Sequence, residues 1–195
     1  MRKAGIADKQ LVVAIISNSF DKNPSVNSVI KNDSKRKERV RSLADYAFET
    51  AVKREGIYLS SDMKGVAICY PFNGKKQTIP DYWNQLKLVV KAISIPRTIE
   101  ILKRESYIKK QRPQSGNYLY FWFFGVLTDA RGKGAAKELK DVLFQESENK
   151  QLPIYLETSV LKNKKVYERF GFEAYHSWQM NGEGPVIWFM RRDLR

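Results

Sequence analysis

Residues 121–141, FWFFGVLTDARGKGAAKELKD, constrain the fold more than any other stretch of the chain. An apolar aromatic run predicts a buried strand, the turn after it holds Gly132 and Gly134, and apolar residues at helical spacing then predict a helix. The first turn of a helix has unpaired N–H groups and the positive end of the helix dipole, so phosphate groups bind there. Glycine also lets a ligand approach the backbone closely. The stretch is therefore either a phosphate-binding loop or an ordinary turn that ends a strand.

The spacing of the glycines excludes two common phosphate-binding motifs. A Walker loop would end in Gly-Lys-Ser or Gly-Lys-Thr, and that ending is absent. A dinucleotide fingerprint needs three glycines, and the third is missing here. A phosphate-binding role for this loop therefore needs support from elsewhere in the chain.

The remaining periodicity predicts an α+β fold with a mixed central sheet, in a single domain over residues 1–195. Helices are expected over residues 9–20, from 34 to before Gly56, over 80–94 and 96–110, after the glycines, and over 162–170. Strands are expected over residues 57–61, 65–72, 117–127, 152–159, 172–180 and 185–192, and the first and last pairs form hairpins.

Composition argues against several classes of protein. No apolar run approaches the roughly 20 residues that span a bilayer, and LVVAII near the start reads as an amphipathic helix, not a signal peptide. Cys69 is the single cysteine, so it cannot form an internal disulfide, and we expect it to be a small buried hydrophobe. One cysteine and one histidine also argue against a zinc site. We expect a cytoplasmic protein with no metal and no membrane partner.

The formal net charge of +14 raises the question of a nucleic-acid partner. Residues 31–41 include six basic and two acidic residues. Residues 103–112 include five basic residues and one acidic residue. Neither cluster carries interleaved aromatic residues or a nucleic-acid motif, so solvated helix faces are the favoured interpretation and we expect no nucleic acid to bind. A polyanionic small molecule is a third reading of the charge.

Two motifs at the right spacing resemble the GNAT acetyltransferase superfamily. Residues 131–136, RGKGAA, match its pyrophosphate signature Arg/Gln-x-x-Gly-x-Gly/Ala. The segment LETSVLKNKKVYERFGFEAY, about twenty residues on, resembles its second cofactor motif. Further matches at Gly184-Pro185 and in the last strand resemble the puromycin N-acetyltransferase-like subgroup. The resemblance covers most of the chain, is specific over residues 125–172 and is loose elsewhere. The sequence departs from the subgroup at residues 160–162, where members often have a proline, and at Cys69, where they often have a tryptophan. Cys69 lies nearer the expected acceptor wall, so that departure puts the substrate in doubt and leaves the cofactor unaffected.

The resemblance implies a GNAT fold: a mostly antiparallel sheet with helices on both faces and a V-shaped splay between two central parallel strands. Acetyl-CoA would lie in the splay, between strands that end near Leu127 and Thr158. A backbone N–H within residues 124–126 would polarise the thioester carbonyl. Backbone groups at Val126 and Leu127 would hold the pantetheine arm. The pyrophosphate would be held by the turn and helix start, namely Arg131, Gly132, Lys133, Gly134, Ala135 and Ala136.

The resemblance also implies direct attack by an amine in a ternary complex, with no acyl-enzyme. Tyr167 is then the candidate acid for the leaving thiolate; its alternative is an aromatic residue packed on the sheet. Asn163, one turn earlier, could bind pantetheine or order the helix start, and the two readings are equal. Glu157 is the candidate general base, against a structural carboxylate or a water relay. His176 receives no catalytic role.

The implied function is transfer of an acetyl group to the primary amine of a small molecule. The acceptor wall would come from the first two helices, the loop over residues 21–33 and the final hairpin. Two alternatives stay open: a basic protein of the same fold that acts on or binds a protein N-terminus, a ribosome or nucleic acid, and a CoA-binding sensor without catalysis. Many superfamily members pair as dimers, but the sequence carries no interface signature that decides whether this chain is a homodimer.

Overall fold

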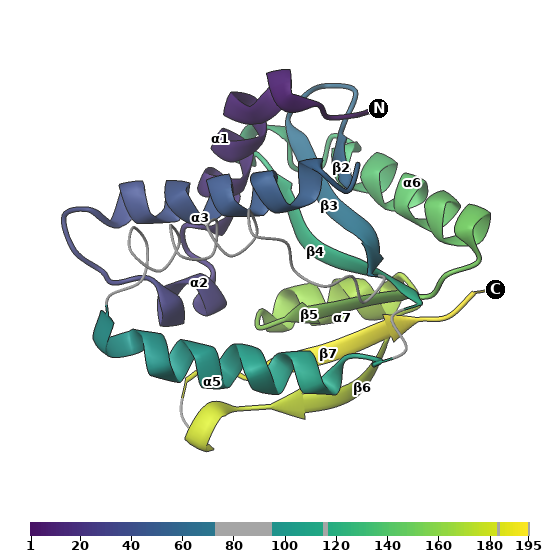
Figure 1. Cartoon of the computed structure of the whole chain (residues 1–195). Coiled ribbons are helices and arrows are strands. Elements are labelled where there is room, and N and C mark those ends of the chain that lie inside the picture. Colours follow the sequence, from purple (N-terminus) through teal and green to yellow (C-terminus); the bar gives the residue numbers. More distant parts are fainter. Residues whose placement is uncertain (73–94, 115–116, 183, 195) are drawn as a thin grey trace.

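The computed structural model describes residues 1–72, 95–114, 117–182 and 184–194. Their centre is a seven-stranded sheet with the order β1-β2-β3-β4-β5-β7-β6 (Figure 1). The strands are β1 Arg2–Lys3, β2 Ile57–Leu59, β3 Gly65–Phe72, β4 Tyr118–Val126, β5 Ile154–Thr158, β6 Glu173–Trp178 and β7 Ile187–Arg192. Because neighbouring strands come from both halves of the chain, the sheet joins its N-terminal and C-terminal parts.

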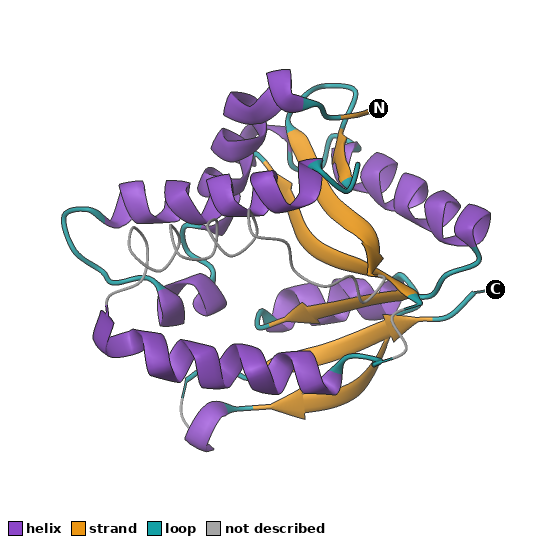
Figure 2. Cartoon of the chain, viewed as in Figure 1, coloured by secondary structure: helices purple, strands orange, loops and turns teal. Residues whose placement is uncertain are grey.

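The junction between β4 and β5 is the irregular point of the sheet. These strands are parallel, whereas the other neighbours are antiparallel. Their register consists of Leu119 with Ile154 and Tyr120 with Tyr155. Beyond Tyr120 the strands run apart, as Figure 2 shows, so each presents an edge without a strand partner. The expected V-shaped splay between two central parallel strands is present.

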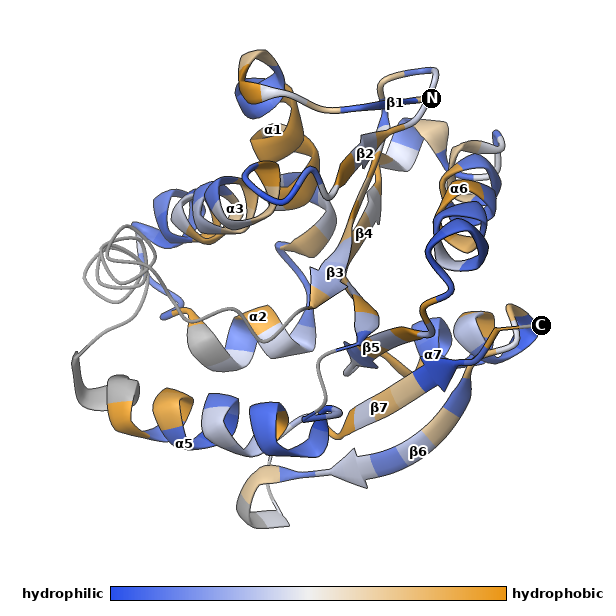
Figure 3. Ribbon diagram, turned by 45° about the vertical axis from the view of Figure 1, so that its right-hand side comes forward, coloured by the Kyte–Doolittle hydropathy of each residue, from blue (hydrophilic) through white to orange (hydrophobic). Residues whose placement is uncertain are grey.

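Helices cover both faces of the sheet. The longer ones are α1 Lys9–Phe20, α3 Arg36–Val52, α5 Ile95–Gln111, α6 Ala135–Lys150 and α7 Leu161–Arg169, and a short α2 spans Pro24–Val29. Alternate residues of β3 and β4 point to opposite faces. One set packs with α1 and α3, and the other packs with α6 and α7. Figure 3 shows hydrophobic residues along most of α1, whereas the edge strand β6 is mostly hydrophilic. Helix α5 covers β6 and β7 on the α1 side through Ile108, Ile187 and Phe189.

The expected fold class is confirmed, and the differences are local. The sequence reading missed α2 and the two-residue strand β1. Asn23 caps α2 by accepting a 2.9 Å hydrogen bond from the Ser25 N–H, and Pro24 is its first residue, where a missing N–H costs nothing. A helix of six residues is too short to show an apolar periodicity in the sequence. The helix expected over residues 80–94 lies outside the described residues. In the part of the chain that is described, no helix is long and apolar enough to cross a membrane.

Candidate active site

The turn between β4 and α6 has the geometry of an open cradle. Gly132 and Gly134 adopt φ values of +78° and +98°, which L side chains rarely adopt. A Cβ atom at either position would meet no atom within 4 Å, so the space in front of the turn is open. Gly134 is the N-cap of α6 and offers no side-chain cap to the helix. A 16-residue helix thus presents its N-terminus directly to solvent.

The N–H groups of this turn are available to an anion. Among the described residues, those of Gly132, Gly134, Ala135 and Ala136 have no backbone partner. The side chains of Arg131 and Lys133 are exposed beside them, whereas Ala135 is buried and anchors the helix start against the sheet. The residues assigned to the pyrophosphate site therefore lie in the turn or in the first two residues of α6, beside free donors and positive charge. The loop fits a pyrophosphate.

Two acidic residues near the turn have their charge compensated. Asp129 pairs with Lys64, and this hydrogen bond lowers the pKa of the Asp129 carboxyl. Glu138, in the first turn of α6, accepts hydrogen bonds from Ser61 and pairs with the N-terminal ammonium. The Ser61 hydroxyl is the main cause of the lowered pKa of Glu138. Both carboxylates are ionised at neutral pH but paired, so they do not cancel the positive potential of the helix start.

The splay edge of β4 begins at an irregularity. The register with β3 shifts between Ile68 and Cys69, which leaves Trp122 as an extra residue in β4. A β-bulge of this kind re-aims the backbone groups that follow it. Val126 ends the strand. The N–H of Leu127 already donates to the Lys64 carbonyl at 2.9 Å, and its own carbonyl accepts from Ala130. Leu127 can therefore serve pantetheine only through the second lone pair of its carbonyl oxygen.

Tyr167 on α7 points into the core on the α6 side of the sheet. Its ring packs edge-on against Phe121 at 6.0 Å and Phe172 at 5.6 Å, and 9% of the residue is exposed. Burial raises the pKa of the Tyr167 hydroxyl above its ordinary value, so the phenol remains protonated at neutral pH. The geometry suits a proton donor and also the alternative of an aromatic residue packed on the sheet.

Asn163 is exposed, one turn before Tyr167. The N-cap of α7 is Val160, whose side chain makes no capping hydrogen bond. The Val160 N–H donates to Thr158 Oγ1 at 3.3 Å. The helix-ordering role considered for Asn163 stays a prediction, as does its role in binding pantetheine.

Glu157 lies on β5 just beyond the last pair with β4, and its carboxylate is held by two groups. Arg112 donates from Nε to Oε1 at 2.7 Å and from Nη2 to Oε2 at 3.0 Å. The Tyr120 hydroxyl donates to Oε2 at 2.9 Å. The side chains of Arg112 and Glu157 are 10% and 12% exposed. The sequence reading placed Arg112 among solvated helix residues, so this partner was missed. The role of Glu157 as base stays a prediction.

Other residues weighed from the sequence lie away from this arrangement. Cys69 is buried, and burial raises the pKa of its thiol, so it is an inert core residue, as expected. His176 Nε2 lies 2.9 Å from the Tyr107 hydroxyl, on the far part of the sheet. Within the described ranges, no three His, Cys, Asp or Glu side chains are grouped so that they could hold a metal ion.

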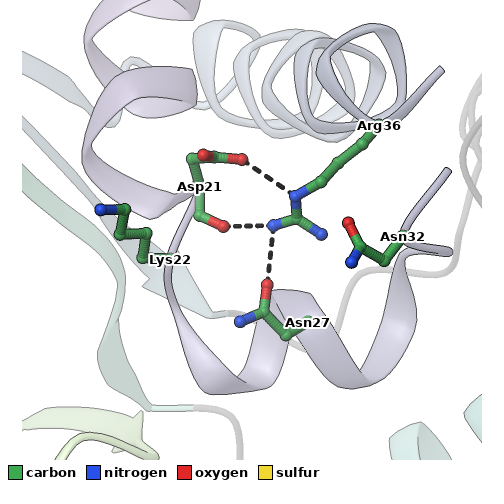
Figure 4. A pocket seen from close by; sticks show the side chains of 5 residues that line it. All are labelled: Asp21, Lys22, Asn27, Asn32 and Arg36. Atoms are coloured by element: carbon green, nitrogen blue, oxygen red, sulfur yellow. Dashed lines mark hydrogen bonds and ion pairs between the residues drawn. The ribbon is translucent and has the colours of Figure 1, made fainter. Parts of the chain in front are cut away.

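The α1–α2 segment brings a polar cavity close to the splay. Phe20 packs edge-on against Phe123 of β4 at 4.8 Å, and the Ser25 hydroxyl donates to Ser159 Oγ at 2.8 Å. A cavity of about 350 Å³ lies between α1, α2 and the start of α3 (Figure 4). It is lined by Asp21, Lys22, Asn27, Asn32 and Arg36. Arg36 donates to Asn27 Oδ1 at 2.7 Å and to both the side chain and the carbonyl of Asp21, so it also ties the three helices together.

The splayed mixed sheet thus has a glycine-headed helix start with open space in front of it, and strand edges without a strand partner. Comparison with known proteins indicates which family the chain resembles. Residues 100–172 match the model of the acetyltransferase (GNAT) family. An uncharacterised N-acetyltransferase of Schizosaccharomyces pombe is 38% identical over 80 residues, which are 41% of this chain. The match spans 32% of that relative's length, about a third.

Solved structures of acetyltransferases align with this fold over the whole chain or nearly all of it. A Corynebacterium glutamicum protein described as histone acetyltransferase HPA2 and related acetyltransferase aligns with TM-score 0.70 at 18% identity, covering 100% of this chain and 95% of that one. Arylalkylamine N-acetyltransferase 2 of Aedes aegypti gives 0.66 at 16% identity, covering 100% and 98%. A polyamine N-acetyltransferase of Drosophila melanogaster gives 0.65 at 9%, covering 99% and 98%. Over residues 100–172, and in the fold of the whole chain, the protein is similar to the GNAT superfamily of acetyltransferases. Its resemblance to the puromycin N-acetyltransferase-like subgroup stays a prediction.

Proposed function

We propose that this chain transfers the acetyl group of acetyl-CoA to the primary amine of a small molecule, within a ternary complex. The observation that carries the proposal is the uncapped, glycine-headed N-terminus of α6, which opens beside unpaired strand edges. A helix start binds phosphate, and a free strand edge can bind an extended chain by main-chain hydrogen bonds. Pyrophosphate and pantetheine supply these two shapes in one molecule.

In this proposal each part of the site has one task. The turn over residues 131–136 binds the pyrophosphate, and the edge of β4 up to Val126 aligns the pantetheine arm. Acetyl-CoA supplies an activated acyl group whose leaving thiolate has a conjugate acid of pKa about 8.5. Tyr167 remains protonated because it is buried, so it can give that thiolate a proton. A direct transfer needs no enzyme nucleophile, in keeping with the inert Cys69.

The acceptor would approach from the face that carries α1, α2 and α5. The polar cavity at Arg36 offers room there for the rest of the molecule. An alkylammonium has a pKa of about 10 and must lose a proton before attack. Glu157, at the splay, is our candidate to receive that proton. The structural neighbours named for arylalkylamines and polyamines support a small amine as the acceptor class. We place the protein in the cytoplasm, where acetyl-CoA and reduced thiols occur together.

The first experiment tests the cradle. Gly134→Glu puts a bulky anion where the pyrophosphate would bind, so we expect calorimetry to show acetyl-CoA binding in the parent and none in the variant. Gly182→Glu is a matched control, because Gly182 also has a positive φ, of +74°, and also faces open space. It carries the same backbone strain outside the proposed site and should bind like the parent. Equal binding by Gly134→Glu and the control would show that the glycines only turn the chain.

A second measurement separates an enzyme from a sensor. Release of free thiol from acetyl-CoA is followed with a panel of primary amines, and we expect at least one amine to accelerate it. A parent protein that binds acetyl-CoA in calorimetry but releases no thiol with any amine would favour the non-catalytic sensor over the transferase.

A further inference from the structure

Three side chains from separate parts of the chain meet where β4 and β5 separate. Tyr120 belongs to the last register pair, Glu157 lies two residues beyond Tyr155 on the same face of β5, and Arg112 follows the end of α5. Arg112 Nη2 also donates to the Tyr120 hydroxyl at 2.7 Å, and its guanidinium lies 4.0 Å above the Tyr120 ring. The group closes the base of the splay on the face from which an acceptor would arrive.

The hydrogen bonds of this group leave one position open. An ionised carboxylate offers about four acceptor positions, two on each oxygen. Both positions on Glu157 Oε2 are taken, one by Arg112 Nη2 and one by the Tyr120 hydroxyl. Oε1 accepts only from Arg112 Nε among the described residues. One acceptor position on Oε1 therefore remains for another donor.

The two partners of the carboxylate hold fixed protonation states. Burial raises the pKa of the Tyr120 hydroxyl well above its ordinary value, so it stays a donor. Burial alone would lower the pKa of Arg112, but Tyr120 and Glu157 outweigh it and raise that pKa above its ordinary value. Arg112 remains a cation. The carboxylate is thus oriented by two donors that do not titrate at neutral pH.

The surface beside the group is aromatic. Trp122, the extra residue at the bulge, is half-buried and stacks near Tyr120 with ring centroids 6.2 Å apart. Tyr46 of α3 is also half-buried and contacts Trp122 edge-on at 5.9 Å. Aromatic rings next to a carboxylate suit a cation attached to an apolar stem.

We propose that Arg112 and Tyr120 are positioning residues that fix the Glu157 carboxylate so that its open position on Oε1 binds the ammonium of the acceptor. The proposal rests on the acetyltransferase function proposed above and names its substrate class: primary amines that are cationic at neutral pH and carry an apolar stem. The ammonium gives one proton to Glu157, which passes it to solvent. The C–N bond forms as the C–S bond breaks. Tyr167 protonates the thiolate and is reprotonated by the second proton that the nitrogen loses.

The test compares two acceptors that differ in charge. Benzylamine is a cation at neutral pH, whereas aniline is uncharged and has the same ring. Tyr120→Phe removes one donor to the carboxylate, so we expect kcat/KM for benzylamine to fall about tenfold, mainly through KM, with little change for aniline. Glu157→Gln should lower kcat/KM for benzylamine about a hundredfold and again spare aniline. A change in the ratio of kcat/KM for benzylamine to kcat/KM for aniline indicates that the variant has altered the binding of the ammonium.

Tyr118→Phe is the matched control. Tyr118 lies two residues before Tyr120 on the same strand and face, and its buried hydroxyl has no hydrogen-bond partner among the described residues. Its loss should leave both acceptors unchanged. If Glu157→Gln does not fold, as judged by circular dichroism, Arg112→Lys replaces it, because it keeps the charge but loses the two-pronged contact. It should shift the ratio in the same direction.

The outcomes separate the inference from the function on which it rests. Equal losses for benzylamine and aniline in Tyr120→Phe would mean that the three residues only stabilise the fold, and the inference would be wrong. An unchanged ratio in Glu157→Gln or Arg112→Lys would have the same meaning. A folded parent that binds acetyl-CoA but acetylates neither amine, nor any other amine, would overturn the proposed function and the inference together.

Discussion

Tyr167 and Asn163 show how far a single spacing can be read. A spacing of four residues on one helix predicts that two side chains are neighbours, and Tyr167 and Asn163 do lie one turn apart on α7. The structure adds what the spacing cannot: Tyr167 is buried between two phenylalanines, and Asn163 is exposed. A buried phenol without a charged neighbour is a protonated one. This is the state that an acid for a leaving thiolate requires.

The acid role predicts a specific kinetic loss. Tyr167→Phe keeps the ring and its packing but removes the proton, so kcat for thiol release should fall about a hundredfold. The affinity for acetyl-CoA, measured by calorimetry, should stay the same. Tyr107→Phe on α5 is a control, since its hydroxyl lies 2.9 Å from His176 Nε2, on the far part of the sheet. An unchanged kcat in Tyr167→Phe would leave only the packing role.

At the scale of helices and strands, periodicity predicted most of the fold. The apolar stripes of α1, α3 and α6 and the aromatic run of β4 are long patterns, so they identify their elements. Periodicity missed α2, because a helix of six residues is too short to show a repeating apolar pattern. It also missed β1, which has two residues and no pattern.

The candidate site also has one part that could be predicted from the sequence and one part that could not. The pyrophosphate turn is local in sequence, so its residues could be named together. The contact between Arg112 and Glu157 joins positions 45 residues apart and follows from how α5 lies across the sheet. A basic residue at a helix end looks the same in sequence whether it faces solvent or a buried carboxylate. Long-range contacts of this kind leave no periodic signal.

Helix α6 carries both the cradle and part of the core, and the two roles can be separated. Leu139 is fully buried, and its Cδ1 lies 2.9 Å from where a Cβ on Gly65 would be. Leu139→Ala should therefore lower the free energy of unfolding by about 2–5 kcal/mol, measured by urea denaturation. The exposed Lys137→Ala should change it by less than about 0.5 kcal/mol. A similar small loss in both would mean that α6 packs loosely on the sheet.

At the scale of the whole molecule, the charge of +14 is spread, not gathered. In the first cluster, Arg36 forms an ion pair with Asp21, and Arg39 forms one with Asp33. In the second cluster, Arg112 forms an ion pair with Glu157. The exposed basic residues that remain in the first cluster lie before α3 (Lys31 and Lys35) or on it (Lys37 and Arg41). Those of the second cluster, Lys103, Lys109 and Lys110, lie on α5. Such a distribution suits solubility and attraction of small anions better than a continuous track for a phosphate backbone.

We therefore expect no saturable binding to nucleic acid. Fluorescence anisotropy with a short generic duplex at about 0.15 M salt should show no binding in the micromolar range, because dispersed charges are screened over a Debye length of about 8 Å. Acetyl-CoA binding in the same buffer serves as the control for active protein. Micromolar binding to the duplex that weakens steeply with salt would instead support a macromolecular partner.

The short register between β4 and β5 means that two parts of one sheet are joined by little of their own backbone. Under the proposed function, the missing strand is supplied from outside the chain. By mass action, a ligand present at a hundred times its Kd adds about 2.7 kcal/mol to the stability of the folded state. The resistance of this fold to heat and to proteolysis would then depend on the metabolic supply of its own cosubstrate.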